Sequence, residues 1–165
     1  MRAKVINEGA GTVSRRERTF AVIFDKGDEV ITGLTTFARE HRLTACHCTA
    51  IGAFSDLTVG FFDWETKDYV KIPINEQVEV LSLVGDIALK DGQPMVHAHE
   101  VVGKSDGTAH GGHLIEGHVR PTLEVILVES PHFLQRTHDE ESGLALIDVG
   151  PSEETATSGR RTAGA

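Results

Sequence analysis

The stretch P-M-V-H-A-H-E-V-V-G-K-S-D-G-T-A-H-G-G-H-L-I-E-G-H-V, residues 94–119, decides how the middle of this chain folds and what it can bind. It contains five of the nine histidines in the 165-residue sequence. His97 and His99 are two residues apart, so on a strand both imidazoles point to the same face. We therefore predict a strand over residues 94–102 that presents two imidazoles side by side.

The segment that follows brings in a third imidazole. Residues 104–107 (K-S-D-G) have the composition of a tight turn, and the glycines at 111 and 112 then allow close approach of the returning backbone. The candidate metal ligands are His97, His99 and His113. Neutral imidazole is the commonest protein ligand for zinc and similar ions, which favours a metal site. The alternative is that each histidine only forms hydrogen bonds on a half-exposed strand, and His110 and His118 are the weaker candidates as ligands.

The composition is that of an ordinary globular protein, with 25% charged and 39% hydrophobic residues. The length fits one domain over residues 16–150, with a flexible lead-in at 1–15 and a disordered polar tail at 151–165. No apolar run is long enough to span a membrane and the first residues lack the apolar core of a signal peptide, so no membrane partner is expected. Two cysteines, Cys46 and Cys48, cannot form a disulfide framework, which favours a cytoplasmic location. A net charge of −9 argues against a broad basic surface for nucleic acid.

The hydrophobic pattern predicts an α+β domain with a mostly antiparallel mixed sheet and one main N-terminal helix. The helix is expected to begin after Asp28 as N-cap and to end near His41. The strands are expected at residues 19–25, 43–53, 57–63, 69–74, 78–89, 94–102, 122–130, 133–137 and 144–149. One helix covers only one face of a sheet, and the strands at 78–89 and 122–130 are apolar on both faces. Another subunit is the natural second cover.

Residues 85–125, G-D-I-A-L-K-D-G-Q-P-M-V-H-A-H-E-V-V-G-K-S-D-G-T-A-H-G-G-H-L-I-E-G-H-V-R-P-T-L-E-V, resemble the central motif of the plant and prokaryote conserved (PPC or PCC) domain. The similarity runs from about Arg18 to Val149. It includes R-T-F-A-V-I-F-D-K-G-D-E-V at 18–30 and R-T-H-D-E-E-S-G-L at 136–144. Stand-alone prokaryotic members usually carry the label "putative DNA-binding protein", and plant members join the domain to AT-hook motifs.

The resemblance implies a divalent metal, zinc, at the three histidines, and a homotrimer of α+β domains. It implies a family turn at Gly111 and Gly112, and it places Glu79 and Glu124 at acidic positions, as candidates to orient the ligands. This chain departs from the plant proteins because it lacks the R-G-R-P core through which an AT-hook binds DNA.

Three functions stay open from the sequence. In the first, the metal of an oligomeric domain holds either structure or a small anionic ligand, since three neutral imidazoles leave one metal position open. In the second, a small metalloenzyme activates water at the metal, with Glu79 or Glu124 as base. The third is DNA binding, by resemblance alone. The sequence contains no nucleophilic triad, phosphate-binding loop or dinucleotide fingerprint, which favours a binding module over an enzyme.

Overall fold

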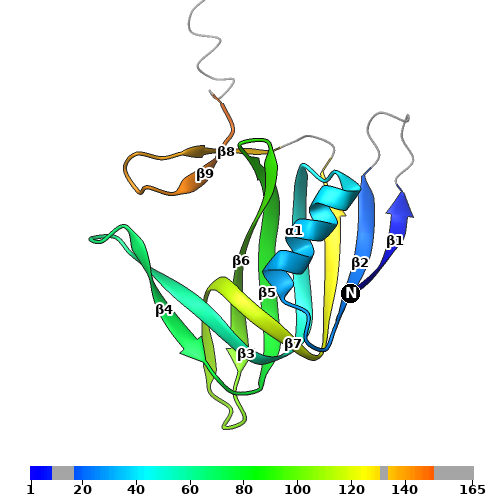
Figure 1. Ribbon diagram of the computed structural model, residues 1–165, viewed down its shortest axis with the longest axis vertical. Helices are drawn as coiled ribbons and strands as arrows, with labels where there is room; N and C mark the ends of the chain where they lie inside the picture. The colour runs from blue at the N-terminus through cyan, green and yellow to red at the C-terminus, as the bar shows by residue number, and fades with distance from the viewer. Residues whose placement is uncertain (9–16, 131–133, 151–165) are drawn as a thin grey trace, which may run out of the picture.

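The computed structural model describes residues 1–8, 17–130 and 134–150 (Figure 1). It has one helix and nine strands within the described residues, and every strand pair is antiparallel except β5 with β8. The predicted α+β class with a mixed, mostly antiparallel sheet is therefore confirmed. The elements are β1 Arg2–Glu8, β2 Arg18–Asp25, α1 Val30–His41, β3 Ala45–Asp63, β4 Asp68–Ile74, β5 Val78–Lys90, β6 Gln93–Gly103, β7 Ala109–Glu129, β8 Gln135–His138 and β9 Ala145–Asp148.

The sheet is organised around two long strands, β3 with 19 residues and β7 with 21. The main path is β1-β2-β7-β3-β5-β8-β9, while β4 pairs with β3 and β6 pairs with both β5 and β7. Strands β3, β5, β6 and β7 therefore close into a ring. Figure 1 shows α1 lying across the sheet, and among the strands it packs mainly against β6 and β7. This ring holds the histidine-rich segment in the middle of the fold.

Two strands are longer than the sequence predicts. The predicted strands at 43–53 and 57–63 are one strand, β3, and the predicted strand at 122–130 is the second half of β7. Register shifts between Gly52 and Phe54, and twice more before Val59, bend the β3–β7 pair without ending it. The Arg120–Pro121 peptide bond inside β7 is cis. The apolar periodicity of the sequence indicates which segments form strands. It does not show that two such segments continue through a bulge as one long strand.

The N-terminal region also differs from the prediction. The flexible lead-in expected at residues 1–15 begins instead with strand β1, which pairs with β2 from Arg2 opposite Ile23 to Glu8 opposite Arg18. Backbone pairing to a neighbouring strand orders this segment, although its sequence has no clear period. Residues 9–16 and the predicted tail at 151–165 lie outside the described residues.

Helix α1 begins one residue later than expected, because Glu29 is the N-cap. Its carboxylate accepts hydrogen bonds from the backbone N–H groups of Ile31 at 2.9 Å and Thr32 at 2.7 Å. Asp28 accepts instead from the N–H of Asp25 at 3.0 Å. One apolar face of the helix packs on the sheet. The helix residues that are buried are Val30, Leu34, Phe37 and Ala38.

The sheet has one face in the core and one largely free of cover. Large side chains of β2, α1 and β7 fill the core, among them Phe20, Phe24, Phe37, Leu123 and Leu127. Cys46 and Cys48 are buried on that side, and His47 between them is exposed. On the opposite face several apolar side chains remain exposed in this single chain, namely Ile51, Val84, Val101 and Ile126. No helix in the described part of the chain is long and apolar enough to cross a membrane.

Candidate metal centre

Strand pairing brings three histidines together. The β5–β6 hairpin presents His97 and His99 on one face of β6, and β7 places His113 directly opposite His99. The ring centroids are 5.2 Å apart for His97 and His99, 5.1 Å for His97 and His113, and 5.3 Å for His99 and His113. One possible ligand atom from each residue lies within 4.8 Å of the other two. These are the three residues that the sequence singles out.

The triad fits a divalent ion that prefers nitrogen ligands. Around a tetrahedral zinc with bonds of about 2.0–2.1 Å, ligand atoms lie roughly 3.3 Å apart, so small side-chain rotations are enough to close the site. Within the described residues, Nδ1 of His113 is buried without a hydrogen-bond partner. A buried nitrogen without a partner lowers the stability of the fold. This cost is removed if the nitrogen binds an ion, or if the ring rotates when an ion binds.

The surroundings favour the neutral form of two of the three imidazoles. Burial, followed by the proximity of His97 and His99, lowers the pKa of His113 to about 4. Partial desolvation of the ring and then the neighbouring His97 also lower the pKa of His99, although the residue as a whole is exposed in the single chain. A neutral imidazole has the lone pair that a metal needs, so protons compete weakly for these two ligands at neutral pH.

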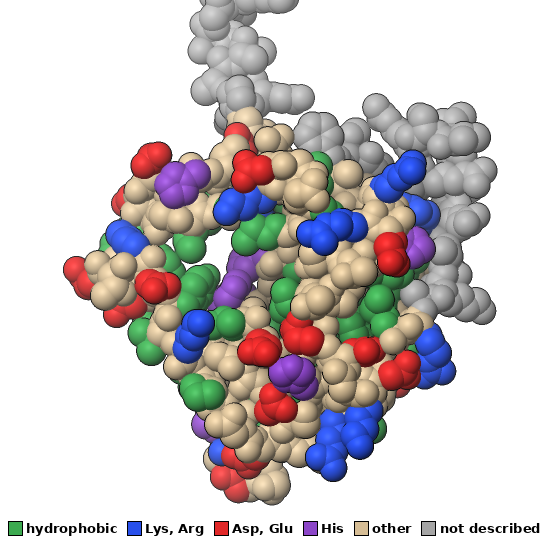
Figure 2. Space-filling model, viewed as in Figure 1, with side chains coloured by type: hydrophobic (Ala, Val, Ile, Leu, Met, Phe, Trp, Pro, Cys, Tyr) green, Lys and Arg blue, Asp and Glu red, His purple; other side chains and the backbone are tan. Residues whose placement is uncertain are grey.

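An aromatic wall supports one side of the triad. Tyr69 of β4 stacks on His113, with ring centroids 4.5 Å apart and planes 23° apart. Gly60 lies opposite His113 on β3, where an added Cβ would come 2.7 Å from the Tyr69 ring. Figure 2 shows histidine side chains inside a hollow of this face, next to hydrophobic side chains. The stacked ring restricts how far His113 can rotate.

Two charged residues missed by the sequence analysis contact the triad. Asp86 of β5 lies opposite His97, with its Oδ2 3.6 Å from Nδ1 of His97. Arg136 of β8 places Nη2 2.5 Å from Oδ1 of Asp86. Asp91 and Gly92, between β5 and β6, are typical of a two-residue hairpin turn, and such a turn sets Asp86 opposite His97. No local pattern points to Arg136, because it arrives through the parallel pairing of β8 with β5.

The two glutamates expected beside the metal do not pair with the histidines in the single chain. Glu79 lies opposite Gly103, the last residue of β6, and Glu124 pairs with Ile23 of β2 and Ile51 of β3. Both carboxylates are exposed, and neither belongs to the histidine group. Within a single chain the strand register places neither glutamate opposite a histidine of the triad, so a role in orienting the ligands stays a prediction.

The glycine pair sits inside a strand and not in a turn. Gly111 and Gly112 belong to β7, and the turn itself lies at residues 104–108, where Gly107 donates to the carbonyl of Lys104 at 3.0 Å. A Cβ at Gly111 would lie 2.5 Å from the carbonyl oxygen of Glu100, and one at Gly112 would lie 2.8 Å from that of Gly60. The predicted close approach of the backbone is thus present on both sides of β7.

A buried acid next to the triad points away from it. Glu100 follows His99 on β6, so its side chain lies on the opposite face of the strand. Burial raises its pKa to about 8, so the carboxyl is mostly neutral at pH 7. In the part of the chain that the structure describes, neither of its oxygens has a hydrogen-bond partner.

The two cysteines of β3 are not candidate metal ligands in their observed state. Burial raises the pKa of Cys46 to about 12 and of Cys48 to about 11, so both are protonated thiols at neutral pH.

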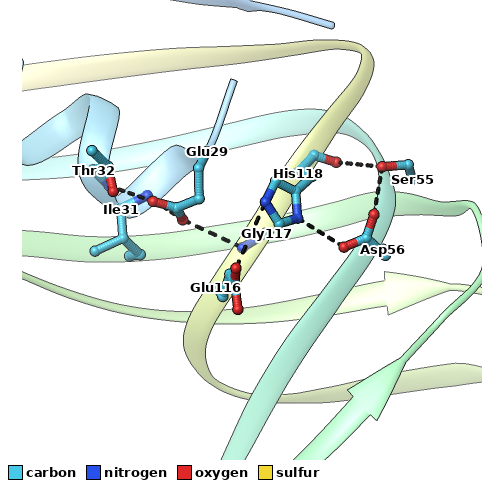
Figure 3. A network of polar contacts seen from close by, with 8 residues as sticks. All are labelled: Glu29, Ile31, Thr32, Ser55, Asp56, Glu116, Gly117 and His118. Atoms are coloured by element: carbon cyan, nitrogen blue, oxygen red, sulfur yellow. Dashed lines mark hydrogen bonds and ion pairs between the residues drawn. The ribbon is translucent and has the colours of Figure 1, made fainter. Parts of the chain in front are cut away.

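The two weaker histidine candidates lie outside the triad. His110 is exposed, 3.4 Å from Oγ1 of Thr108. His118 belongs to a polar network that joins β3, β7 and the start of α1 (Figure 3). Its Nδ1 lies 2.8 Å from Oδ1 of Asp56, whose other oxygen accepts from the hydroxyl of Ser55 at 2.7 Å. The serine proton is directed to Asp56, so this cluster is not a nucleophilic triad.

This network makes a pH-dependent contribution to stability. The hydrogen bond to Asp56 is the main cause that raises the pKa of His118. A raised pKa in the folded state stabilises the fold when the group is protonated, and this stabilisation is lost as pH rises through the folded-state pKa. We expect His118→Gln to lower the free energy of unfolding more at about pH 6 than at about pH 9. Urea unfolding at both pH values measures this, with His110→Gln on the same strand as the control; an equal loss at both would contradict it.

Comparison with known proteins extends these observations. The family model described as the Plants and Prokaryotes Conserved (PCC) domain matches residues 11–131. A plant- and prokaryote-conserved (PPC) protein from Pyrococcus horikoshii is 33% identical, with a TM-score of 0.77, over 81% of this chain and 93% of that one. A protein from Archaeoglobus fulgidus described as metal-containing is 34% identical, with a TM-score of 0.74, over 87% and 98%. A "putative DNA binding protein" from Bacteroides thetaiotaomicron is 30% identical, with a TM-score of 0.75, over 79% and 91%. No curated protein matches the chain.

Proposed function

This chain belongs to the Plants and Prokaryotes Conserved (PCC) domain family, and we propose that it is a metal-binding member in which His97, His99 and His113 hold one divalent ion, zinc. The observation that carries the proposal is the convergence of three ligand atoms within 4.8 Å from two paired strands. Three imidazole nitrogens suit zinc, and the low pKa of His113 keeps one of them available to the ion. The Archaeoglobus fulgidus relative, described as metal-containing, adds support.

The ligand set favours an open centre. Three neutral imidazoles leave the charge of a divalent ion uncompensated, and a tetrahedral ion has one further position for water or an oxyanion. When bound, zinc supplies a Lewis-acid position there. The chain's own residues hold and orient the ligands. The candidate bases Glu79 and Glu124 are distant, and Asp86 is paired with Arg136. This favours binding of a small anion over hydrolysis.

Metal content of tag-free protein tests the proposal. We expect about one zinc ion per chain by elemental analysis, or the same stoichiometry when zinc is titrated into chelator-treated protein. Phosphate and acetate then serve as probes of the open position, and each is expected to bind the zinc-loaded form more tightly than the metal-free form. Protein that takes up no zinc in either experiment would contradict the metal centre.

Direct DNA binding is the weaker alternative. The DNA-binding description belongs to the relative from Bacteroides thetaiotaomicron, and this chain has a net charge of −9 without an R-G-R-P segment. DNA affinity depends on clustered lysine and arginine that displace counterions from phosphates. A salt-dependent shift with duplex DNA, equal in zinc-loaded and metal-free protein, would favour the DNA function over the metal-dependent one.

We also propose that the chain forms a homotrimer, as the family resemblance implies, and the exposed apolar face supports a subunit interface. Ile51 is 61% exposed and Ile126 is 41% exposed on the sheet face opposite the core, and a partner subunit is the natural cover for such a face. Light scattering is expected to give about 54 kDa, three times the chain mass of 17.9 kDa. Ile126→Glu should shift the mass to that of a monomer, while Leu146→Glu on β9 should not. A monomeric wild type, or equal behaviour of the two variants, would contradict the trimer.

A further inference from the structure

A buried arginine ties the C-terminal hairpin to the neighbourhood of the metal centre. The side chain of Arg136 on β8 is only 4% exposed. Its Nη1 donates to the carbonyl oxygen of Ala145, next to β8 on β9, at 3.0 Å, and its Nη2 donates to Oδ1 of Asp86 on β5 at 2.5 Å. Burying a guanidinium is costly unless it is paired, so Arg136 and Asp86 depend on each other. Nη1 thus anchors the guanidinium to β9, and Nη2 fixes where the carboxylate of Asp86 lies.

The free oxygen of this carboxylate faces a histidine of the triad. Oδ2 of Asp86 is 3.6 Å from Nδ1 of His97, and Nη2 of Arg136 is 3.4 Å from the same nitrogen. A divalent ion on Nδ1 would lie against the guanidinium, whose positive charge repels it. The other ring nitrogen, Nε2, is therefore the one that His97 offers to a metal.

We propose that Asp86 and Arg136 are positioning residues for the metal centre, which set the orientation and tautomer of His97 so that Nε2 binds the ion. The proposal rests on the proposed metal site. A histidine that binds metal through Nε2 carries its proton on Nδ1 and commonly donates it to a carboxylate, which fixes the ring. Nη2 of Arg136 cannot donate to a protonated Nδ1, so its role with metal present is to hold Asp86.

This pairing brings a residue from outside the span of the matching family model to the site. The family model ends at residue 131, whereas Arg136 lies on β8 and its second anchor, Ala145, on β9. The hairpin β8–β9 meets the rest of the sheet through two β5 residues, Leu89 and Lys90. Because this strand pairing is short, the ion pair between Arg136 and Asp86 is an important polar contact between the hairpin and the histidine triad. Metal binding is thereby linked to the order of the hairpin.

The test compares zinc affinities of matched variants by competition with a chromophoric chelator. Asp86→Asn and Arg136→Gln are each expected to weaken zinc binding about 10- to 100-fold, the usual effect of removing an outer partner of a metal ligand. The control is Glu129→Gln, which removes a similar part-buried ion pair, Arg18–Glu129 at 2.6 Å, far from the histidines. It is expected to change zinc affinity less than about twofold.

A second readout separates positioning from general stability. Cobalt substituted for zinc reports ligand geometry through its visible absorption, and Asp86→Asn is expected to change that spectrum while Glu129→Gln leaves it as in wild type. Arg136→Lys keeps the charge but loses the two-pronged geometry, so it should restore the affinity only in part. Variants that match the affinity and cobalt spectrum of wild type, whatever their melting temperature, would overturn the proposal. If wild type binds no zinc, the metal site itself fails.

Discussion

Replacement of His99 by alanine is expected to weaken zinc binding by more than about 100-fold, because losing only an outer partner of a ligand already costs 10- to 100-fold. His99 pairs with His113 across β6 and β7 and lies beside His97 on β6, so it adjoins both other members of the triad. Its removal leaves two imidazoles, too few for a stable zinc site. Isothermal titration of zinc into metal-free protein measures the loss.

The fold should survive this change. His99 is exposed in the single chain and is not part of the buried core, so the melting temperature of the metal-free variant is expected to stay close to that of metal-free wild type. His110→Ala is the matched control, since His110 is also exposed and lies on the adjoining strand. Equal zinc affinity of the His99 variant and the His110 variant would contradict the three-histidine site.

Gly111→Ala is expected to have the largest combined effect on stability and metal binding. The added Cβ would lie 2.5 Å from the carbonyl oxygen of Glu100, a backbone atom that moves only if β6 moves. Forcing such a shift typically costs about 1–3 kcal/mol. It also separates His113 on β7 from His99 on β6, since both lie next to this contact in the paired strands. We therefore expect a lower midpoint of urea unfolding together with weaker zinc binding.

Gly103→Ala is the matched control for this substitution. Gly103 also lies where β6 and β7 pair, but a Cβ there meets only the side chain of Leu81, at 3.3 Å, which can rotate away. We expect Gly103→Ala to lower the free energy of unfolding much less than Gly111→Ala does, and to leave the zinc affinity unaltered. If Gly103→Ala and Gly111→Ala proved equally mild, the close backbone contact would not be what positions His113.

The local part of the site could be predicted from the sequence. The spacing of His97 and His99, the tight turn before β6 and the loop at residues 104–108 are each set by neighbouring residues. Because a two-residue turn fixes the register of a hairpin, it also fixes the pairing of His97 with Asp86. The short-range rules of strands and turns were sufficient for these features.

The parts that were not predicted depend on long-range pairing. Bulges join segments of β3 and β7 that look separate in the sequence, and β1 is ordered by pairing with β2. Glu79 and Glu124 matched acidic positions of the family, but the register carries both away from the triad. Arg136 comes from a strand that pairs in parallel with β5, a contact with no local signal. Long-range register thus decided which charged residues face the histidines.

X-ray absorption at the zinc edge of the loaded, tag-free protein tests the central claim most directly, because it identifies the atoms bound to the ion. We expect about three imidazole nitrogens at roughly 2.0 Å and one additional oxygen, with no sulfur contribution near 2.3 Å. In His99→Ala the imidazole signal should fall. A spectrum dominated by sulfur would assign the ion to Cys46 and Cys48, and one dominated by oxygen would assign it to surface carboxylates. Either result would contradict a metal centre built from His97, His99 and His113.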